Sequence, residues 1–160
     1  AAHLDEFEKN DLQLIWQTGK PFYSTAKHAA EGKTSIWVND FIMQMEYAYA
    51  AADAVISRSG AMSVSELCVQ KKAVLFVPYP FAAEDLQTAN AKNLVDKNAA
   101  MMIKDSDAMH SLVPAIIALV KDEQKVETFK NNIGKLAITN ADEVVAKNII
   151  QSIMQDQTTA

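Results

Sequence analysis

The stretch VISRSGAMSVSELCVQKKAVLFVPYP, from Val55 to Pro80, decides the fold. It joins a β-branched apolar run to a helical pattern and then to a second apolar run that ends near two prolines. Strands that alternate with helices in this way are typical of parallel sheets with helical crossovers. The turn before the helix holds Arg58, the single arginine of the chain, and Gly60, one of its four glycines. An unusual turn between a strand and a helix is therefore the first candidate for a site.

The same alternation extends in both directions along the chain. Apolar runs predict strands at Leu12–Trp16, Thr34–Val38, Ala54–Arg58, Ala73–Pro78 and Ala99–Ile103. Helical patterns between them predict helices near Pro21–Glu31, Phe41–Ala52, Ala61–Lys71 and Asp85–Lys97. Only helical patterns follow, near Asp107–Lys121, Glu123–Leu136 and Ala141–Gln155. We predict an α/β fold in one domain, a Rossmann-like doubly wound parallel sheet with C-terminal helices.

Composition narrows the class of protein. The 160 residues are 49% hydrophobic and 22% charged, which excludes a disordered chain, and no apolar run reaches the roughly 18 residues of a membrane span. A net charge of −5 with scattered lysines argues against nucleic-acid binding. The single cysteine, Cys68, forms no internal disulfide and is expected to be a packed thiol in a reducing compartment. The start, AAHLDEFEKND, has neither an initiator Met nor a signal-peptide pattern, and we expect it to be internal to a longer protein.

The turn at Gly60 has the features of a phosphate site. Glycine lets a backbone approach a ligand, and the amides of Ala61, Met62 and Ser63 open a helix whose dipole favours an anion. Glu66 lies about two helical turns in, where a carboxylate can accept two hydrogen bonds from a ribose diol. The alternative is structural: an N-cap serine at 59, a sterically convenient glycine and a solvated glutamate. The local sequence leaves both interpretations open.

Other candidate binding residues lie at or after the ends of neighbouring predicted strands. Arg58 is suited either to a phosphate or to an internal pairing with an acid or with carbonyls. Asp85 and Gln87 open a helix after a rigid loop with two prolines, which suits a sugar, although helix capping explains an acid there equally well. The backbone of Ile42 is a candidate seat for a base, while a core role is the ordinary alternative. The three histidines are dispersed, and no metal site or cofactor is predicted.

Together these segments resemble a known family. The segments are IWQTGK at Ile15–Lys20, FI at Phe41, YAAADAVISRSGAMSVSE at Tyr49–Glu66 and LFVPYPFAAEDLQTANA at Leu75–Ala91. They resemble the donor-binding C-terminal half of the MurG-type glycosyltransferases, which add N-acetylglucosamine to the lipid-linked muramyl-pentapeptide of peptidoglycan. The resemblance covers nearly the whole chain and favours the phosphate interpretation of the turn at Gly60.

The resemblance implies a GT-B architecture of two Rossmann-like domains with UDP-N-acetylglucosamine in the cleft between them. By motif, Ile42 would meet uracil through its backbone, the amides from Ala61 to Ser63 would hold the diphosphate, and Glu66 would take the ribose hydroxyls. Gln87, with Asp85, would contact the sugar. Transfer would invert the anomeric centre, with helix amides rather than a metal stabilising the departing UDP.

Two departures from the family pattern limit what this chain is expected to do alone. Leu86 stands where members usually have a histidine, and the glycine-rich loop that opens the donor domain is missing. We expect residues 1–160 to be a donor-binding domain without its first strand, that loop and the N-terminal acceptor domain with the catalytic base, and therefore inactive by itself. The parent would work at the cytoplasmic face of the bacterial inner membrane as a peripheral protein. The rival hypotheses are another nucleotide-sugar transferase of the GT-B type and a non-catalytic α/β module that binds a protein.

Overall fold

A computed structural model describes the backbone of residues 1–158 and the side chains as far as Met154. Its strands are β1 (Leu14–Gln17), β2 (Ile36–Asn39), β3 (Ala54–Ser57), β4 (Ala73–Phe76) and β5 (Met101–Met102). The helices are α1 (Leu4–Lys9), α2 (Lys20–Ala29), α3 (Met45–Ala51), α4 (Ala61–Val69), α5 (Leu86–Val95), α6 (Ala108–Lys121), α7 (Glu123–Gly134) and α8 (Ala141–Thr158). Two short 3-10 helices, η1 (Ala83–Asp85) and η2 (Asp105–Asp107), precede α5 and α6. The predicted α/β class and all five strands are confirmed.

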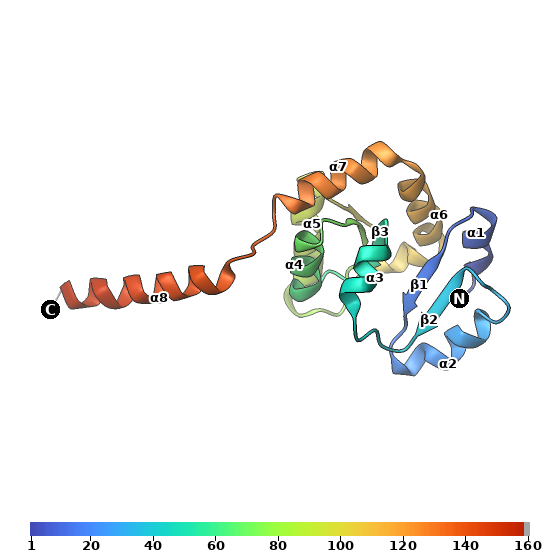
Figure 1. The fold of residues 1–160 in the computed structure, drawn as a ribbon, viewed down its shortest axis with the longest axis horizontal. Coiled ribbons are helices and arrows are strands. Elements are labelled where there is room, and N and C mark those ends of the chain that lie inside the picture. The colour runs from blue at the N-terminus through green and yellow to red at the C-terminus, as the bar shows by residue number, and fades with distance from the viewer. Residues whose placement is uncertain (159–160) are drawn as a thin grey trace.

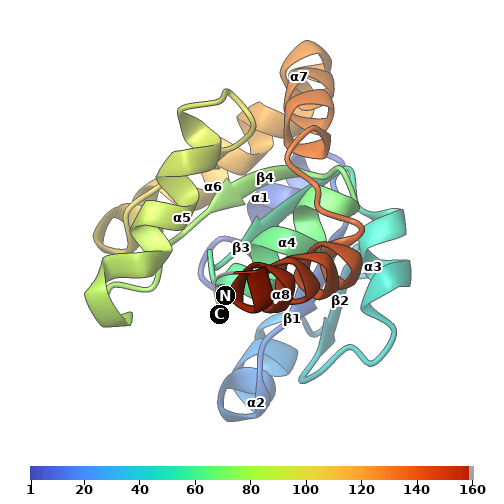
Figure 2. The same cartoon turned by 90° about the vertical axis from the view of Figure 1, so that its left-hand side faces the viewer.

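The strands form two hydrogen-bonded sheets, whereas the sequence led us to expect one. β1 pairs with β2, and β3 pairs with β4, which pairs with β5; all of these pairs are parallel. Both Figure 1 and Figure 2 show β1 between β2 and β3, so the open edge of β1 faces the open edge of β3. The prediction of a single continuous sheet is therefore wrong for these residues.

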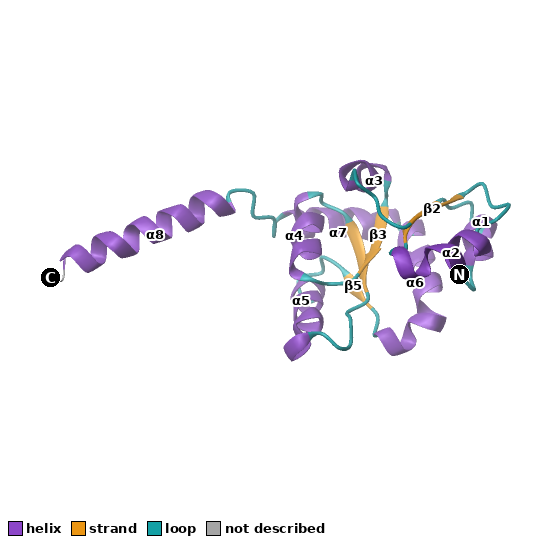
Figure 3. Ribbon diagram, turned by 90° about the horizontal axis from the view of Figure 1, so that it is seen from below, coloured by secondary structure: helices purple, strands orange, loops and turns teal. Residues whose placement is uncertain are grey.

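Helices cover both faces of the three-stranded sheet. One buried cluster joins Phe76 on β4 to Leu67 on α4 and Leu94 on α5. The other joins Leu75, the neighbouring residue of β4, to Leu119 on α6 and Phe129 on α7. Since successive side chains of a strand point to opposite faces, these two clusters are the two layers of a doubly wound fold. Figure 3 shows α3 and α6 on opposite sides of β3.

Helix α1 was not predicted, and it packs on the same face as α2. Phe7 of α1 belongs to the cluster in which Leu14 of β1 packs. Trp16, two residues along β1, contacts Phe22 of α2 with 5.9 Å between ring centroids. Leu14 and Trp16 share a face of β1 because strand side chains repeat every two residues.

Helix α3 begins four residues later than predicted. Asp40 N–H donates to the side chain of Asn39 (2.9 Å), and Phe41 N–H donates to the side chain of Asp40 (2.8 Å). Side chains that bond to nearby amides compete with helix formation, so residues 40–44 remain a loop. Ile42 is therefore in the loop after β2 and not in a helix.

Helix α8 extends away from the rest of the molecule, as Figure 1 shows. Every side chain described in it, from Ala141 to Met154, is exposed. Over residues 1–158, no helix has both the length and the apolar character that crossing a bilayer requires.

Candidate functional site

Ser59 anchors the turn between β3 and α4. Its side chain is fully buried, and its hydroxyl donates to the carbonyl of Gln87 (2.7 Å). Its amide donates to Gln87 Oε1 (3.3 Å), and its carbonyl accepts from Asn90 Nδ2 (3.0 Å). The turn is thereby fixed to the first two turns of α5. The alternative in which the Ser59 hydroxyl caps α4 is wrong, because the hydroxyl is bonded to α5 and no side chain caps α4.

Gln87 links this turn to a second loop. Its Oε1 also accepts from the amide of Tyr79 (2.9 Å), in the loop that follows β4. Only the Nε2 donors of Gln87 are left for a ligand, and Nε2 lies 4.0 Å from the position of a Cβ built on Gly60. Gln87 is therefore a structural bridge whose amide group faces the turn at Gly60.

Gly60 and the start of α4 form an open helix N-terminus. Gly60 has φ −64°, which any residue adopts, and an added Cβ would meet no atom closer than 4.0 Å. Neither backbone conformation nor internal packing therefore requires a glycine here. Ala61 and Met62 are exposed and Ser63 is half-buried, and their amides are the first of the helix. The arrangement can accept an anion at close range.

Glu66 lies on the exposed side of α4 and has a partner on α3. The Tyr49 hydroxyl donates to Glu66 Oε2 at 3.2 Å. Burial, and then the nearby charge of Glu66, raise the pKa of Tyr49 to about 12. Tyr49 is therefore a neutral hydrogen-bond donor to Glu66 throughout the physiological pH range.

Arg58 binds the protein itself. Its Nη1 donates to the carbonyls of Val77 and Pro78 (3.1 Å each) and to Asp105 Oδ1 (2.5 Å), and its guanidinium lies 5.6 Å from the ring centroid of Tyr79. These contacts favour the internal pairing over the phosphate role. A direct contact of Arg58 with a donor stays a prediction.

Asp85 has an unusual backbone conformation. Asp85 and its neighbour Glu84 both have positive φ (51° and 53°), and no side chain caps the following helix, so helix capping does not explain the acid.

The backbone amide of Ile42 has an internal partner. The amide donates to Gln17 Oε1 (2.8 Å). Ile42 also borders a hollow of about 560 Å³ that Ile15, Trp37 and Phe41 line. A base that binds this amide would replace the oxygen of Gln17.

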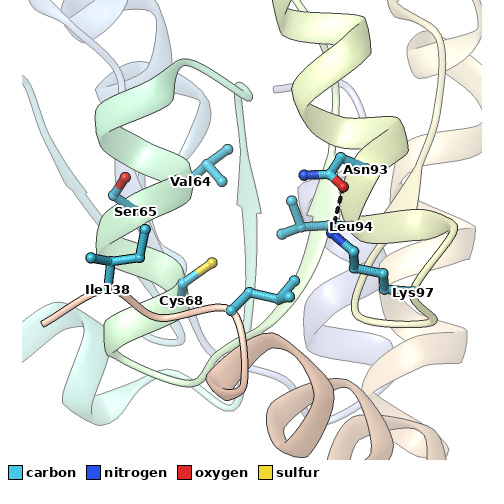
Figure 4. Close-up of a pocket in the computed structure, with 8 residues that line it drawn as sticks. Val64, Ser65, Cys68, Asn93, Leu94, Lys97 and Ile138 are labelled. Carbon is cyan, nitrogen blue, oxygen red and sulfur yellow. Dashed lines mark hydrogen bonds between the residues drawn. The ribbon is translucent and has the colours of Figure 1, made fainter.

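A smaller pocket of about 220 Å³ lies between α4 and α5 (Figure 4). Val64, Ser65 and Cys68 line it from α4, and Lys97, after α5, donates to Asn93 (2.6 Å) at its other side. Burial raises the pKa of the Cys68 thiol, which belongs to the core cluster beside Leu67, as predicted for a packed thiol. None of the predicted site residues lines this pocket.

The structure brings most of the predicted residues to one edge. Arg58, the turn from Gly60 to Ser63, and Gln87 are connected through the hydrogen bonds of Ser59 and Gln87, and Glu66 follows on α4. The sequence analysis missed Gln17 and Tyr49 as supporting residues, considered Ser59 only as a helix cap, and considered Asn90 only as part of the polar group that opens the helix at Asp85. Asn90 carried a signal, because it follows Gln87 by three residues and so shares its helix face. Within the described part of the chain, no group of three or more His, Cys, Asp or Glu residues could hold a metal.

Comparison with known proteins identifies a family that this chain matches. The model of the glycosyltransferase family 28 C-terminal domain matches residues 2–149. A UDP-N-acetylglucosamine–N-acetylmuramyl-(pentapeptide) pyrophosphoryl-undecaprenol N-acetylglucosamine transferase of Parabacteroides distasonis is 47% identical over 152 residues, which are 94% of this chain and 41% of that protein. The transferase of the same name from Porphyromonas gingivalis is 38% identical over 159 residues, or 98% of this chain and 42% of that protein.

A solved structure is also similar. The crystal structure of Acinetobacter baumannii MurG matches with a TM-score of 0.76 and 30% identity, covering 84% of this chain and 42% of that one. This chain thus spans about two fifths of the length of the curated relatives and of the solved structure that it matches.

Proposed function

This chain belongs to the glycosyltransferase family 28 C-terminal domains, and from that premise we propose that it binds the donor in an N-acetylglucosaminyltransferase of peptidoglycan synthesis. The donor is UDP-N-acetylglucosamine. The acceptor is undecaprenyl-pyrophosphoryl-muramyl-pentapeptide, which the remainder of a longer protein binds. The reaction inverts the anomeric centre.

One observation carries the proposal: the open N-terminus of α4 beside a glycine that nothing inside the protein requires. Space is left at Gly60, and the amides of Ala61, Met62 and Ser63 are free of side-chain caps. A helix N-terminus of this kind stabilises a diphosphate, and it stabilises it further when the departing UDP gains charge. The chemistry needs neither a metal nor a cofactor from this chain.

The surrounding residues bind the ribose, the uracil and the sugar of the donor. Glu66 accepts from the ribose hydroxyls, and the Ile42 amide binds uracil once Gln17 has moved away. The Nε2 group of Gln87 and the carboxylate of Asp85 contact the sugar. Arg58 supports the loop after β4 through the carbonyls of Val77 and Pro78.

We place the catalytic base and the acceptor site in an N-terminal domain of the longer protein, outside residues 1–160, and with them the first strand of the donor domain and its glycine-rich loop. The chain alone transfers no sugar, because proximity of donor, acceptor and base is what a two-domain cleft provides. The parent acts at the cytoplasmic face of the inner membrane as a peripheral protein.

Substitution at Gly60 tests the proposal. Gly60→Val keeps an allowed φ but places two methyl groups where the diphosphate approaches. In titrations of the full-length protein we expect UDP to bind more tightly than ADP or GDP, and Gly60→Val to weaken UDP binding at least tenfold. The unfolding free energy should fall by only about 1 kcal/mol, the usual effect of a poorer N-cap residue. Unchanged UDP affinity in a folded Gly60→Val protein would exclude this turn as the diphosphate site.

A further inference from the structure

We propose that Tyr49 is a positioning residue that holds the Glu66 carboxylate where it accepts the hydroxyls of the donor ribose. The proposal rests on the proposed function, because it requires a ribose at Glu66. It adds a residue of α3 to a site otherwise built from strand ends, α4 and α5.

The contact joins a packed ring to an exposed carboxylate. Tyr49 is half-buried and packs against the cluster of Leu67, Val74 and Phe76, so its hydroxyl has a defined position. Glu66 is exposed, and within residues 1–154 the recorded hydrogen bond of its carboxylate is the one from Tyr49 at 3.2 Å. An unsupported glutamate would lose rotamer freedom when the ligand binds, and this loss would lower the affinity. Tyr49 removes part of that cost beforehand.

The position of Tyr49 in the chain couples two parts of the nucleoside site. Helix α3 begins at Met45, directly after the loop that carries Ile42, and Glu66 lies on α4 beyond β3. The hydrogen bond of Tyr49 thus connects the helix that follows the proposed base seat to the proposed ribose acceptor. A carboxylate bonded to Tyr49 through Oε2 keeps its other oxygen available for the diol.

Binding of UDP and 2′-deoxy-UDP to the full-length protein tests the role. Tyr49→Phe removes only the hydroxyl and keeps the packed ring. We expect the Kd for UDP to rise about threefold to tenfold, the range set by immobilising one flexible side chain. The Kd for 2′-deoxy-UDP should rise less, because that ligand offers one hydroxyl fewer to the oriented carboxylate. In a Glu66→Ala background, Tyr49→Phe should change the UDP Kd by less than about twofold.

Tyr23→Phe is the matched control. It deletes the same hydroxyl on α2, where the ring lies 5.6 Å from Lys27 Nζ, and we expect no change in either Kd. If Tyr49 were merely structural, Tyr49→Phe would weaken the binding of both nucleotides by the same factor or would not weaken it. Either result overturns the proposal. If wild-type protein does not bind UDP, the proposed function fails. If Glu66→Ala leaves UDP binding intact, the ribose contact fails and the role of Tyr49 with it.

Discussion

At the scale of single residues, the site is held by partners that lie far apart in the sequence. The candidate roles of Gly60, Ser63 and Glu66 follow from local chemistry, namely a turn, a helix N-terminus and a carboxylate on that helix, and they stay predictions. For Arg58 the sequence offered internal pairing as one of two possibilities but could not name the partners, which lie 19, 20 and 47 residues further along the chain. A side chain with several possible partners is assigned only when the fold brings one set of them into reach. The buried hydroxyl of Ser59 escaped prediction for the same reason, because its acceptor is on α5.

Ser59→Ala tests how strongly this anchor contributes to stability. The substitution removes the hydroxyl of a fully buried side chain, and with it the 2.7 Å hydrogen bond to the carbonyl of the half-buried Gln87. An intramolecular hydrogen bond contributes about 0.5–1.5 kcal/mol to stability. We expect the free energy of unfolding in urea to fall by that amount. Ser65→Ala, at an exposed position of α4, is the control and should stay within about 0.5 kcal/mol of wild type. Equal, small effects of both substitutions would show that the Ser59 hydrogen bond contributes nothing to stability.

At the scale of elements, hydrophobic periodicity predicted which helices and strands exist better than it predicted the residues at which they begin and end. Strand β4 is buried at each of its residues, and a continuous apolar run at Ala73–Phe76 indicated such a strand directly. Asn98, three residues after the end of α5, has φ 51°, a left-handed conformation that asparagine tolerates better than most residues. Helix α3 is the exception, because the hydrogen bonds of Asn39 and Asp40 delay its start. Helix α1 is short and carries only two buried residues, too few for a periodic signal.

Helix α8 should be separable from the stability of the rest of the molecule. Its described side chains are all exposed, including apolar ones such as Val145 and Ile149. Surface changes away from packed features usually alter stability by no more than about 0.5 kcal/mol. A chain that ends at Asn140 should therefore unfold in urea with a free energy within that margin of the complete chain. A loss of 2 kcal/mol or more would mean that α8 packs on the body in solution.

At the scale of the whole molecule, the arrangement of the two sheets predicts that a further strand would fit between them. Helices α1 and α2 lie on the same face of β1, since Leu14 packs with Phe7 and Trp16 contacts Phe22. Parallel strands are joined by right-handed crossovers, so a strand before α1 lies on the side of β1 opposite to β2. That side faces β3 (Figures 1 and 2). Sheet continuity could not be predicted from these residues, because strand pairing depends on which neighbours are present.

Hydrogen exchange tests whether a strand fills this gap. The Leu14 amide donates to the Ser35 carbonyl, so the backbone groups of Leu14 and Trp16 point from β1 toward β2. The Ser57 carbonyl accepts from the Val77 amide, so the backbone groups of Ser57 and Val55 point from β3 toward β4. The amides of Ile15, Gln17, Ala54 and Ile56 therefore face the open edges, while Trp16 and Val55 are already bonded. When the chain is extended by the residues encoded upstream of Ala1, exchange at the four open-edge amides should slow at least tenfold. Trp16 and Val55 should change much less, because a ladder bond protects them in both proteins. Uniform slowing of all six amides would indicate global stabilisation without a strand between the sheets, and no slowing would place the upstream segment elsewhere.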